Sequence, residues 1–288
     1  MSYILELSHV SYEYSPKTPF ATVALRGIDL GFRRGRITGV IGHTGSGKST
    51  LVQMLNGLLR PSEGQILLDG EDIWAKPKEI AKVRFRVGLV MQYPEYQLFA
   101  ETIRDDIGFG PLNMKLSAEE VALRVQEAAA FVGLSEPLLS KSPFELSGGQ
   151  RRRAAIAGVL AMRPEVLILD EPAAGLDPRG RAEILSGLCR YGRESGTTLI
   201  LVSHSMEDMA QYCDDVAVMN DAAIYLKGTV DEVFSRAEEL EAIGLDIPAV
   251  AKIATALRRR GIALEGDLYT VSGVRDAILR ALGKGGAV

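Results

Sequence analysis

A stretch of glycine, hydroxyl and lysine residues near position 45 has the spacing of a phosphate-binding loop. Glycines let the backbone curl so that its N–H groups point inward, and with a following helix start they form an anion site. Residues 37–41 are typical of a short buried strand and residues 50–56 of a helix. We therefore expect Lys48 to reach the β- and γ-phosphates of a nucleotide and Ser49 to ligate Mg²⁺. The residues predicted to hold the phosphates are Gly42, His43, Thr44, Gly45, Ser46, Gly47, Lys48, Ser49 and Thr50.

Two adjacent carboxylates stand at the end of another apolar run. Residues 166–169 are apolar throughout, as in a buried parallel strand. This strand delivers Asp170 and Glu171 to its C-terminal end, where open α/β sheets place their ligand chemistry. One carboxylate there is commonly a helix cap. Two of them, downstream of a phosphate loop, predict a Mg²⁺ ligand and a general base.

Other polar and aromatic residues sit near predicted strand ends. Gln92 follows a strand at 88–91 and has an amide suited to Mg²⁺ or to a water molecule, and His204 follows the buried strand 197–203. Taken singly, Gln92 is more simply an ordinary loop glutamine, and His204 could be a capping or loop histidine. Tyr12 and Tyr14 precede the turn at 15–19. They predict either cross-strand packing in the core or stacking of one ring on a nucleotide base.

The elements that position these residues change along the chain. Short strands are expected over residues 3–34, and helical periodicity dominates from about 101 to 162. Within that stretch a helix opens with three arginines at 151–153 in its first turn, where cations oppose the helix dipole. They predict a solvated face or, beside glycine N–H groups, a phosphate contact. Beyond about residue 238 an apolar stripe predicts a tail that packs on the main domain or on a partner.

Composition excludes several classes of protein. The 288 residues are 47% apolar and 24% charged, which suits a soluble globular chain with one large domain and an appendage or two modest domains. A net charge of −4 gives no reason to expect a nucleic-acid partner. Cys189 and Cys213 follow no metal or redox spacing and are expected to be reduced. No apolar run approaches the ~18 residues of a membrane span, and the N-terminus lacks a signal peptide's basic region. Any membrane role is therefore expected to be peripheral.

Taken in order, the motifs resemble those of ABC ATPases over residues 1 to about 235. The run 146–150 (Leu-Ser-Gly-Gly-Gln) resembles the signature motif and 166–171 the Walker B strand. Gln92 is then similar to the Q-loop glutamine, 174–177 to the D-loop and His204 to the switch histidine. The resemblance implies a P-loop ABC ATPase fold of the α/β class. Its parts are a mixed, largely parallel sheet core, an N-terminal antiparallel β subdomain and an inserted helical subdomain at about 95–162. We expect the ATPase domain to span 1–236 and a small α-helical extension, for packing or dimerisation, to span 237–288.

The resemblance also implies roles for individual residues. Glu171 would be the general base for attack of water on the γ-phosphorus, and His204 would sense the γ-phosphate. The implied catalytic residues are Glu171, His204, Gln92 and Lys48. The implied Mg²⁺ ligands are Ser49, Gln92 and Asp170. The implied cofactors are ATP and Mg²⁺.

Two ATPase subunits face head to tail in such proteins. Each ATP lies between the phosphate loop of one subunit and the signature residues of the other, here Ser147, Gly148, Gly149 and Gln150. Asp177 would lie at the subunit interface and couple the two sites. Tyr14 would stack on adenine, with Tyr12 as the alternative.

A finer resemblance is to the ATPase subunits of energy-coupling factor (ECF) transporters, of the second-subunit type. It rests on the run 92–99 and on the insertion at 18–20. It implies a heterodimer with a second ABC ATPase, a transmembrane coupling subunit and a substrate-binding membrane subunit. The chain would act at the cytoplasmic face of the cell membrane in uptake of a vitamin or other micronutrient or metal ion. Four carboxylates are candidates for docking a basic coupling helix: Glu95, Glu101, Asp105 and Asp106. They are equally compatible with a solvated helix face whose negative charges complement the N-terminal end of the helix dipole.

Three alternatives remain at this point. The chain could serve another ABC importer. It could be a soluble ABC ATPase of DNA repair, translation or iron–sulfur assembly, although it lacks a coiled-coil insertion, a second cassette and a basic face. It could also be a nucleotide-binding scaffold without turnover, against which the intact Glu171 and His204 argue.

Overall fold

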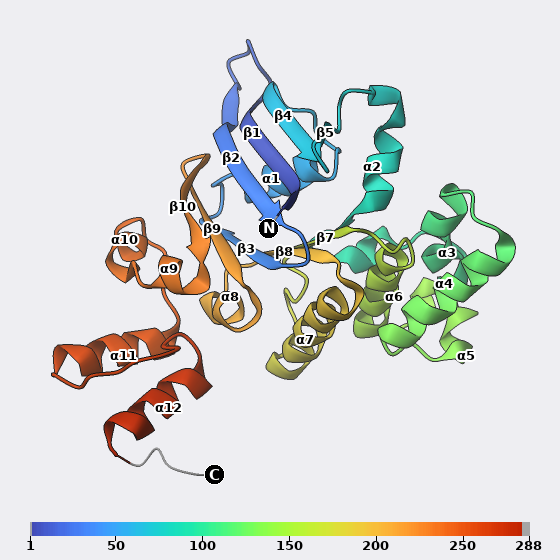
Figure 1. Cartoon of the computed structure of the whole chain (residues 1–288). Helices are drawn as coiled ribbons and strands as arrows, with labels where there is room; N and C mark the ends of the chain where they lie inside the picture. The colour runs from blue at the N-terminus through green and yellow to red at the C-terminus, as the bar shows by residue number, and fades with distance from the viewer. Residues whose placement is uncertain (1, 284–288) are drawn as a thin grey trace.

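The computed structural model describes residues 2–283, which form two β-sheets with helices around them (Figure 1). The smaller sheet is antiparallel, with the order β2-β1-β4-β5, and its strands are β1 Tyr3–Tyr14, β2 Thr22–Arg33, β4 Glu63–Leu68 and β5 Glu71–Asp72. The larger sheet has the order β10-β9-β3-β8-β7-β6. Its strands are β3 Ile37–Gly42, β6 Val87–Val90, β7 Val166–Asp170, β8 Thr198–Val202, β9 Asp215–Asn220 and β10 Ala223–Thr229.

The larger sheet is parallel from β6 to β9, and β10 is its antiparallel edge strand. Strands β3, β7 and β8 are buried along their whole length, as their uninterrupted apolar runs predict. Parallel pairing brings the C-terminal ends of β3, β6, β7 and β8 to one edge of the sheet. That edge carries the phosphate loop and the polar residues that follow the other strands.

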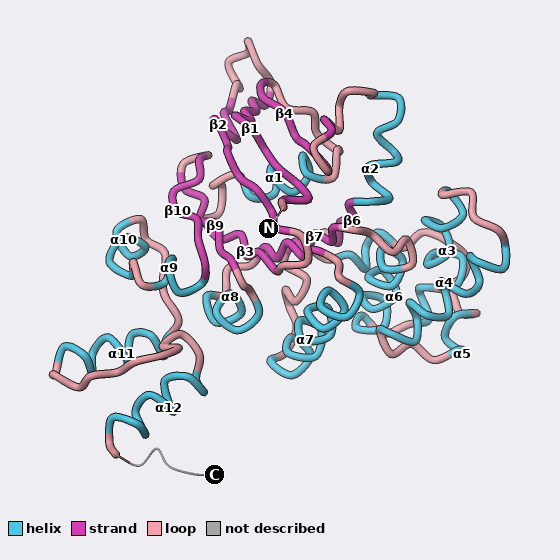
Figure 2. The backbone as a smooth tube through the Cα atoms, viewed as in Figure 1, coloured by secondary structure: helices cyan, strands magenta, loops and turns pink. Residues whose placement is uncertain are grey.

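Helices surround the sheets and also form the part of the described chain farthest from the N-terminal sheet (Figures 1 and 2). Their bounds are α1 Lys48–Leu55, α2 Ile80–Arg86, α3 Ile103–Asn113, α4 Ala118–Phe131, α5 Glu136–Leu139, α6 Gly148–Leu160, α7 Pro178–Ser195, α8 Met206–Tyr212, α9 Val230–Phe234, α10 Ala237–Ala242, α11 Ala249–Arg259 and α12 Val271–Ala281. Short 3₁₀ segments are η1 Pro77–Glu79, η2 Pro94–Gln97 and η3 Pro143–Glu145. Within residues 2–283, none of these helices is both long and apolar enough to cross a membrane.

Each face of the larger sheet has its own core. Alternate side chains such as Ile168 and Ile200 pack with α1 and the antiparallel sheet. Their neighbours Leu167 and Leu201 pack with α6, α7 and α8 on the opposite face. This alternation follows from the pleat of the strands, because successive side chains point to opposite faces. The sheet is thereby fixed on both sides, and its C-terminal edge is a rigid base for the loops.

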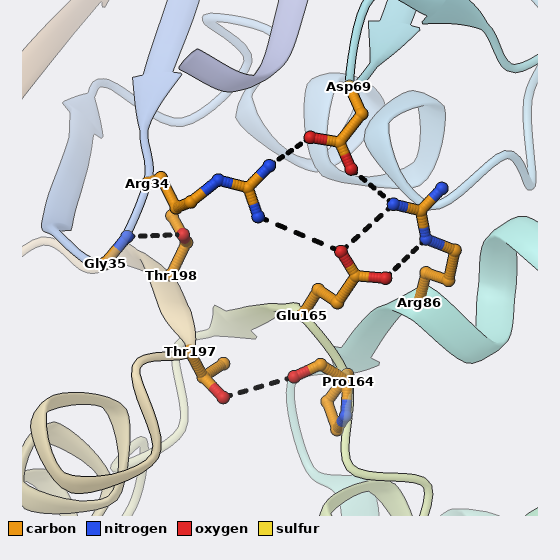
Figure 3. Close-up of polar contacts among 8 residues, drawn as sticks. All are labelled: Arg34, Gly35, Asp69, Arg86, Pro164, Glu165, Thr197 and Thr198. Carbon is orange, nitrogen blue, oxygen red and sulfur yellow. Dashed lines mark hydrogen bonds and ion pairs between the residues drawn. The ribbon is translucent and has the colours of Figure 1, made fainter. Parts of the chain in front are cut away.

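A ring of ion pairs joins the two sheets at the other end of the strands (Figure 3). Glu165, just before β7, accepts bonds of 2.5 and 3.0 Å from Arg86. Asp69 contacts both Arg86 and Arg34, and Arg34 lies 4.0 Å from Glu165. All four side chains are 36–45% exposed, so the ring adds little free energy. Its position, at the edge away from the phosphate loop, indicates a role in orienting the sheets.

The N-terminal strands differ from expectation. Short strands were expected over 3–34, but β1 and β2 are 12 residues each. Their pairing contains several register shifts. Each shift interrupts the alternation of apolar and polar residues, so one long strand has the pattern of several short ones.

Candidate active site

A pocket of about 490 Å³ lies at the C-terminal edge of the larger sheet. It brings together most of the residues singled out in the sequence. Its lining consists of Tyr14, Thr22, Val23, Ala24, Thr44, Gly45, Gly47, Lys48, Ser49, Thr50, Gln92, Asp170, Glu171, Val202 and His204. Five separate segments converge here, namely the β1–β2 hairpin and the loops after β3, β6, β7 and β8.

The phosphate loop is already closed around its lysine. Lys48 Nζ donates to the carbonyl oxygens of Gly42 at 2.6 Å and His43 at 2.8 Å. Gly47 has φ +103°, and a Cβ there would lie 2.4 Å from the Ala24 carbonyl oxygen, so only glycine fits. Burial lowers the pKa of Lys48, opposed by the nearby carboxylates. A buried cation at a helix start suits a phosphate group.

The carboxylates stand at the tip of β7. Glu171 has φ +49°, and its N–H donates to Val202 O at 3.0 Å. The left-handed backbone is strained for a glutamate, and such strain persists where surrounding contacts enforce it. Burial and the charge of Asp170 raise the pKa of Glu171 to about 7, opposed by Lys48. Burial also raises the pKa of Asp170.

Glu171 and His204 face each other across the pocket. Glu171 Oε1 is buried without a hydrogen-bond partner and lies 3.5 Å from His204 Nε2. Burial lowers the pKa of His204, as do the charges of Lys48 and His43. A carboxylate with a pKa near neutrality and an unsatisfied oxygen is suited to accept a proton from water. In the phosphate loop, Ser46 Oγ is likewise buried without a hydrogen-bond partner.

The two tyrosines have different surroundings. Tyr14 lines the pocket, is 40% exposed, and its hydroxyl lies 3.2 Å from Thr50 Oγ1. Tyr12 packs against the core, and its ring meets that of Tyr14 edge-on at 4.8 Å. Thr22, Val23 and Ala24 also line the pocket, although they belong to none of the motifs recognised in the sequence. The register of the β1–β2 hairpin would have indicated their place, because Thr22 pairs with Tyr14, which itself lines the pocket.

The signature residues and Asp177 lie outside this pocket. Ser147 Oγ accepts the N–H of Gln150 at 3.3 Å, and Gln150 Oε1 accepts the N–H of Ser147 at 2.9 Å. This capping box leaves Gly148 and Gly149 open, since no atom lies within 4 Å of a Cβ built at either. Asp177 caps α7, and the N–H groups of Gly180 and Arg179 lower its pKa. Neither helix start contributes a residue to the pocket that holds the chain's own phosphate loop.

One of the three arginines is neither solvated nor free for a phosphate. Arg152 is 4% exposed and pairs with Glu95 through bonds of 3.0 and 2.8 Å. Its Nη1 donates to Ala174 O at 2.7 Å, and its guanidinium lies 5.9 Å from the centre of the Tyr93 ring. Arg152 thus ties together the loop after β6, helix α6 and the loop after β7.

Two of the four proposed docking carboxylates are corrected by these contacts. Glu95 is committed to Arg152. Asp106 accepts the backbone N–H groups of Phe99 and Ala100 at 3.1 and 2.9 Å. Glu101 and Asp105 remain at the surface. Among residues 2–283 no group of three or more His, Cys, Asp or Glu side chains forms a metal cluster.

The two-sheet core, the inserted helices and this pocket define an ATP-binding cassette of the ABC class. The family pattern described as ABC transporter matches residues 25–174. In structure, the chain is similar to cbiO1 of Clostridium perfringens, described as part of the ABC transporter complex cbiONQ. That match has a TM-score of 0.74 and 41% identity, and covers 90% of this chain and 100% of the other. A dimeric ATP-binding cassette bound to ADP and Pi matches with a TM-score of 0.70 at 26% identity over 78% of this chain and 98% of its own.

Curated relatives narrow the class further. The energy-coupling factor transporter ATP-binding protein EcfA2 of Caldanaerobacter subterraneus subsp. tengcongensis is 52% identical, over 96% of this chain and 97% of its own. The EcfA2 protein of Symbiobacterium thermophilum is 53% identical over 96% of both chains. The chain therefore belongs to the family of energy-coupling factor transporter ATP-binding proteins, and it binds and hydrolyses ATP.

Proposed function

We propose that Glu171 is the general base of ATP hydrolysis. Its near-neutral pKa and unpartnered Oε1 support this role, because the group must take a proton from the water that attacks the γ-phosphorus. Lys48 and the loop N–H groups hold the β- and γ-phosphates, and His204 contacts the γ-phosphate opposite Glu171. Positioning and charge neutralisation then contribute most of the rate, as in other phosphoryl transfers.

Ser49, Gln92 and Asp170 would hold Mg²⁺. A hydroxyl, an amide and a carboxylate are the hard oxygen ligands that Mg²⁺ takes, and all three side chains line the same pocket. The ion, when bound, neutralises charge on the phosphate oxygens. Tyr14 stacks on the adenine ring, which its exposed place in the pocket lining supports over Tyr12.

The signature residues and Asp177 serve the site of a second ATPase subunit. Their position outside the chain's own pocket supports this arrangement, because a helix start with two open glycines would otherwise have no phosphate to bind. The partner would be a different ABC ATPase. The related cbiO1 is described as part of the ABC transporter complex cbiONQ.

The membrane partner would dock on the helical region beside the loop after β6. Tyr96, Phe99 and Phe109 are 80%, 66% and 50% exposed there, and the two phenylalanine rings meet edge-on at 4.9 Å. Exposed aromatic groups of this kind mark protein contacts. Glu101 and Asp105 are the nearby carboxylates left for a basic coupling helix. The chain would then sit at the cytoplasmic face of the membrane and power uptake of a vitamin, other micronutrient or metal ion.

Nucleotide trapping tests the catalytic assignment. Glu171→Gln should keep ATP binding, lose turnover and accumulate a closed dimer, whereas Lys48→Ala should lose ATP binding. Purified wild type and both variants would be assayed for phosphate release and for ATP retained on the protein. Turnover by Glu171→Gln near the wild-type rate would refute the assignment of the base.

A mild-detergent pull-down from native membranes tests the partners. Recovery of a second ATPase with polytopic membrane proteins is expected, and Phe99→Ser should lose the membrane proteins. Leu123→Ser, at a 45% exposed site on α4, is the matched control. Recovery of only soluble proteins by the wild type would overturn the transport assignment.

A further inference from the structure

The segment between α10 and α11 contacts the phosphate loop. His43 Nε2 lies 2.5 Å from Ile243 O. A carbonyl oxygen only accepts hydrogen bonds, so Nε2 carries the proton and donates. The carbonyl of His43 accepts the bond from Lys48 at 2.8 Å. A single residue therefore connects the C-terminal extension to the lysine that binds phosphate.

The other end of the same segment contacts the switch loop. Glu207 Oε1 accepts the N–H of Ala249, the first residue of α11, at 3.3 Å. Glu207 lies in the first turn of α8, whose N-cap Ser205 directly follows His204. A carboxylate at the start of a helix is favourably placed, because the N–H groups there have no partner within the helix. The extension thus contacts both the phosphate loop and the start of the helix that directly follows His204.

Between these ends the segment is packed into the main core. Leu245 and Ile247 are 6% and 4% exposed and belong to the same core cluster as Met206 and Met209 of α8. Gly244 has φ +75°, and a Cβ there would lie 3.4 Å from the His43 ring. The buried side chains of Leu245 and Ile247 therefore anchor the segment in the core, while the hydrogen bonds at its two ends lie at the surface.

We infer that residues 243–249 are a positioning element of the ATP site, holding the phosphate loop through His43 and the switch loop through Glu207. Binding of nucleotide and docking of this segment are then linked, and each must affect the other by the same factor. The inference goes beyond the proposed transport role. It concerns the ATP site of a single chain and does not depend on membrane partners or on how subunits pair.

Variants of His43 in the full-length chain test the link. Binding of an N-methylanthraniloyl ATP analogue with Mg²⁺ would be followed by fluorescence. His43→Ala should weaken binding about three- to tenfold, the range expected for one lost hydrogen bond. His43→Gln restores an N–H donor and should recover most of the affinity. His9→Ala, an exposed histidine on β1, is the matched control and should bind as wild type.

Extension-side variants separate positioning from a direct effect on the phosphate loop. Leu245→Ala loosens the segment without touching the loop, and it should weaken nucleotide binding in the same direction. The effect of His43→Ala should then shrink in the Leu245→Ala background, because coupled residues are not additive. Glu207→Ala removes the acceptor of the Ala249 N–H and should lower kcat more than it weakens binding, since it acts on the helix start that follows His204.

Hydrogen exchange gives a readout that does not depend on activity. In the wild type, nucleotide should slow amide exchange in residues 243–249, and in His43→Ala it should no longer do so. The inference would be overturned if His43→Ala and Leu245→Ala bound nucleotide with wild-type affinity and if nucleotide did not change the amide exchange rates of residues 243–249. Should His43→Ala fail to fold, the nucleotide binding and turnover of Glu207→Ala and the wild-type exchange data test the inference instead. A wild-type chain that bound no nucleotide would instead contradict the ATPase assignment, and it would be evident before any variant was made.

Discussion

Replacing Glu171 with glutamine should stabilise the nucleotide-free chain at neutral and alkaline pH. Burial beside Asp170 raises the pKa of Glu171 from 4.5 to about 7. Between those two pH values the folded protein binds a proton that the unfolded chain has released. The free energy of unfolding of the wild type therefore falls as pH rises through this window. Glutamine is neutral throughout and carries no such cost.

The size of the effect follows from the two pKa values. Their difference, about 2.5, corresponds to about 3 kcal/mol at about 1.4 kcal/mol for each pKa unit. The side chain is only 17% exposed, so water screens it little. Below pH 4.5 both proteins are neutral at this position and should be equally stable. The advantage of the variant should grow up to about pH 7 and stay constant above that.

Urea unfolding measures this directly. Both proteins would be titrated in EDTA, without nucleotide, at intervals across the acid and neutral range. Glu194→Gln, at an exposed position on α7, controls for a glutamate-to-glutamine change at the surface. A difference between wild type and Glu171→Gln that did not vary with pH would refute the electrostatic account. Lower stability of the variant at neutral pH would do the same.

Four further substitutions test other contacts. Arg152→Met should lower the free energy of unfolding by about 3–5 kcal/mol, measured by urea, because it leaves Glu95 charged, buried and unpaired; a loss below 1 kcal/mol would show that the pair is dispensable. Ser147→Ala should cost about 1 kcal/mol through loss of the α6 cap, seen as a lower urea midpoint with an unchanged slope. Tyr14→Ala should weaken ATP binding by about five- to 150-fold in a fluorescence titration, because it removes one stacking partner worth about 1–3 kcal/mol. Tyr12→Ala should instead lower stability, and the reverse pattern would exchange the two assignments.

The phosphate loop and the strand tips could be predicted from the sequence because their residues are contiguous. Residues 37–50 contain strand, turn and helix start in one stretch, and β7 and β8 are unbroken apolar runs that end at Glu171 and His204. Parallel pairing then requires these tips to meet at one edge, as they do. The long strands β1 and β2 were not predicted, since register shifts disrupt their alternation.

Contacts between distant segments could not be predicted in this way. Arg152 meets Glu95 across 57 residues, and His43 meets Ile243 across 200. An arginine in a helix's first turn has an unfavourable place in the dipole, which predicts solvent exposure. A bidentate carboxylate and a carbonyl oxygen offset that cost, and they become visible only when the helix is placed against two loops.

These long-range contacts bear on how the site works. Arg152 binds the loops that carry Gln92 and Asp177, whereas residues 243–249 bind those that carry Lys48 and His204. Most of the pocket residues lie at the C-terminal ends of strands of the larger sheet or in the segments that follow them. The contacts that Arg152 and residues 243–249 make with these segments lie outside the pocket. A substitution at either outer contact should therefore alter nucleotide binding or turnover although no residue that lines the pocket has been replaced. Substitutions confined to the motifs would not detect that dependence.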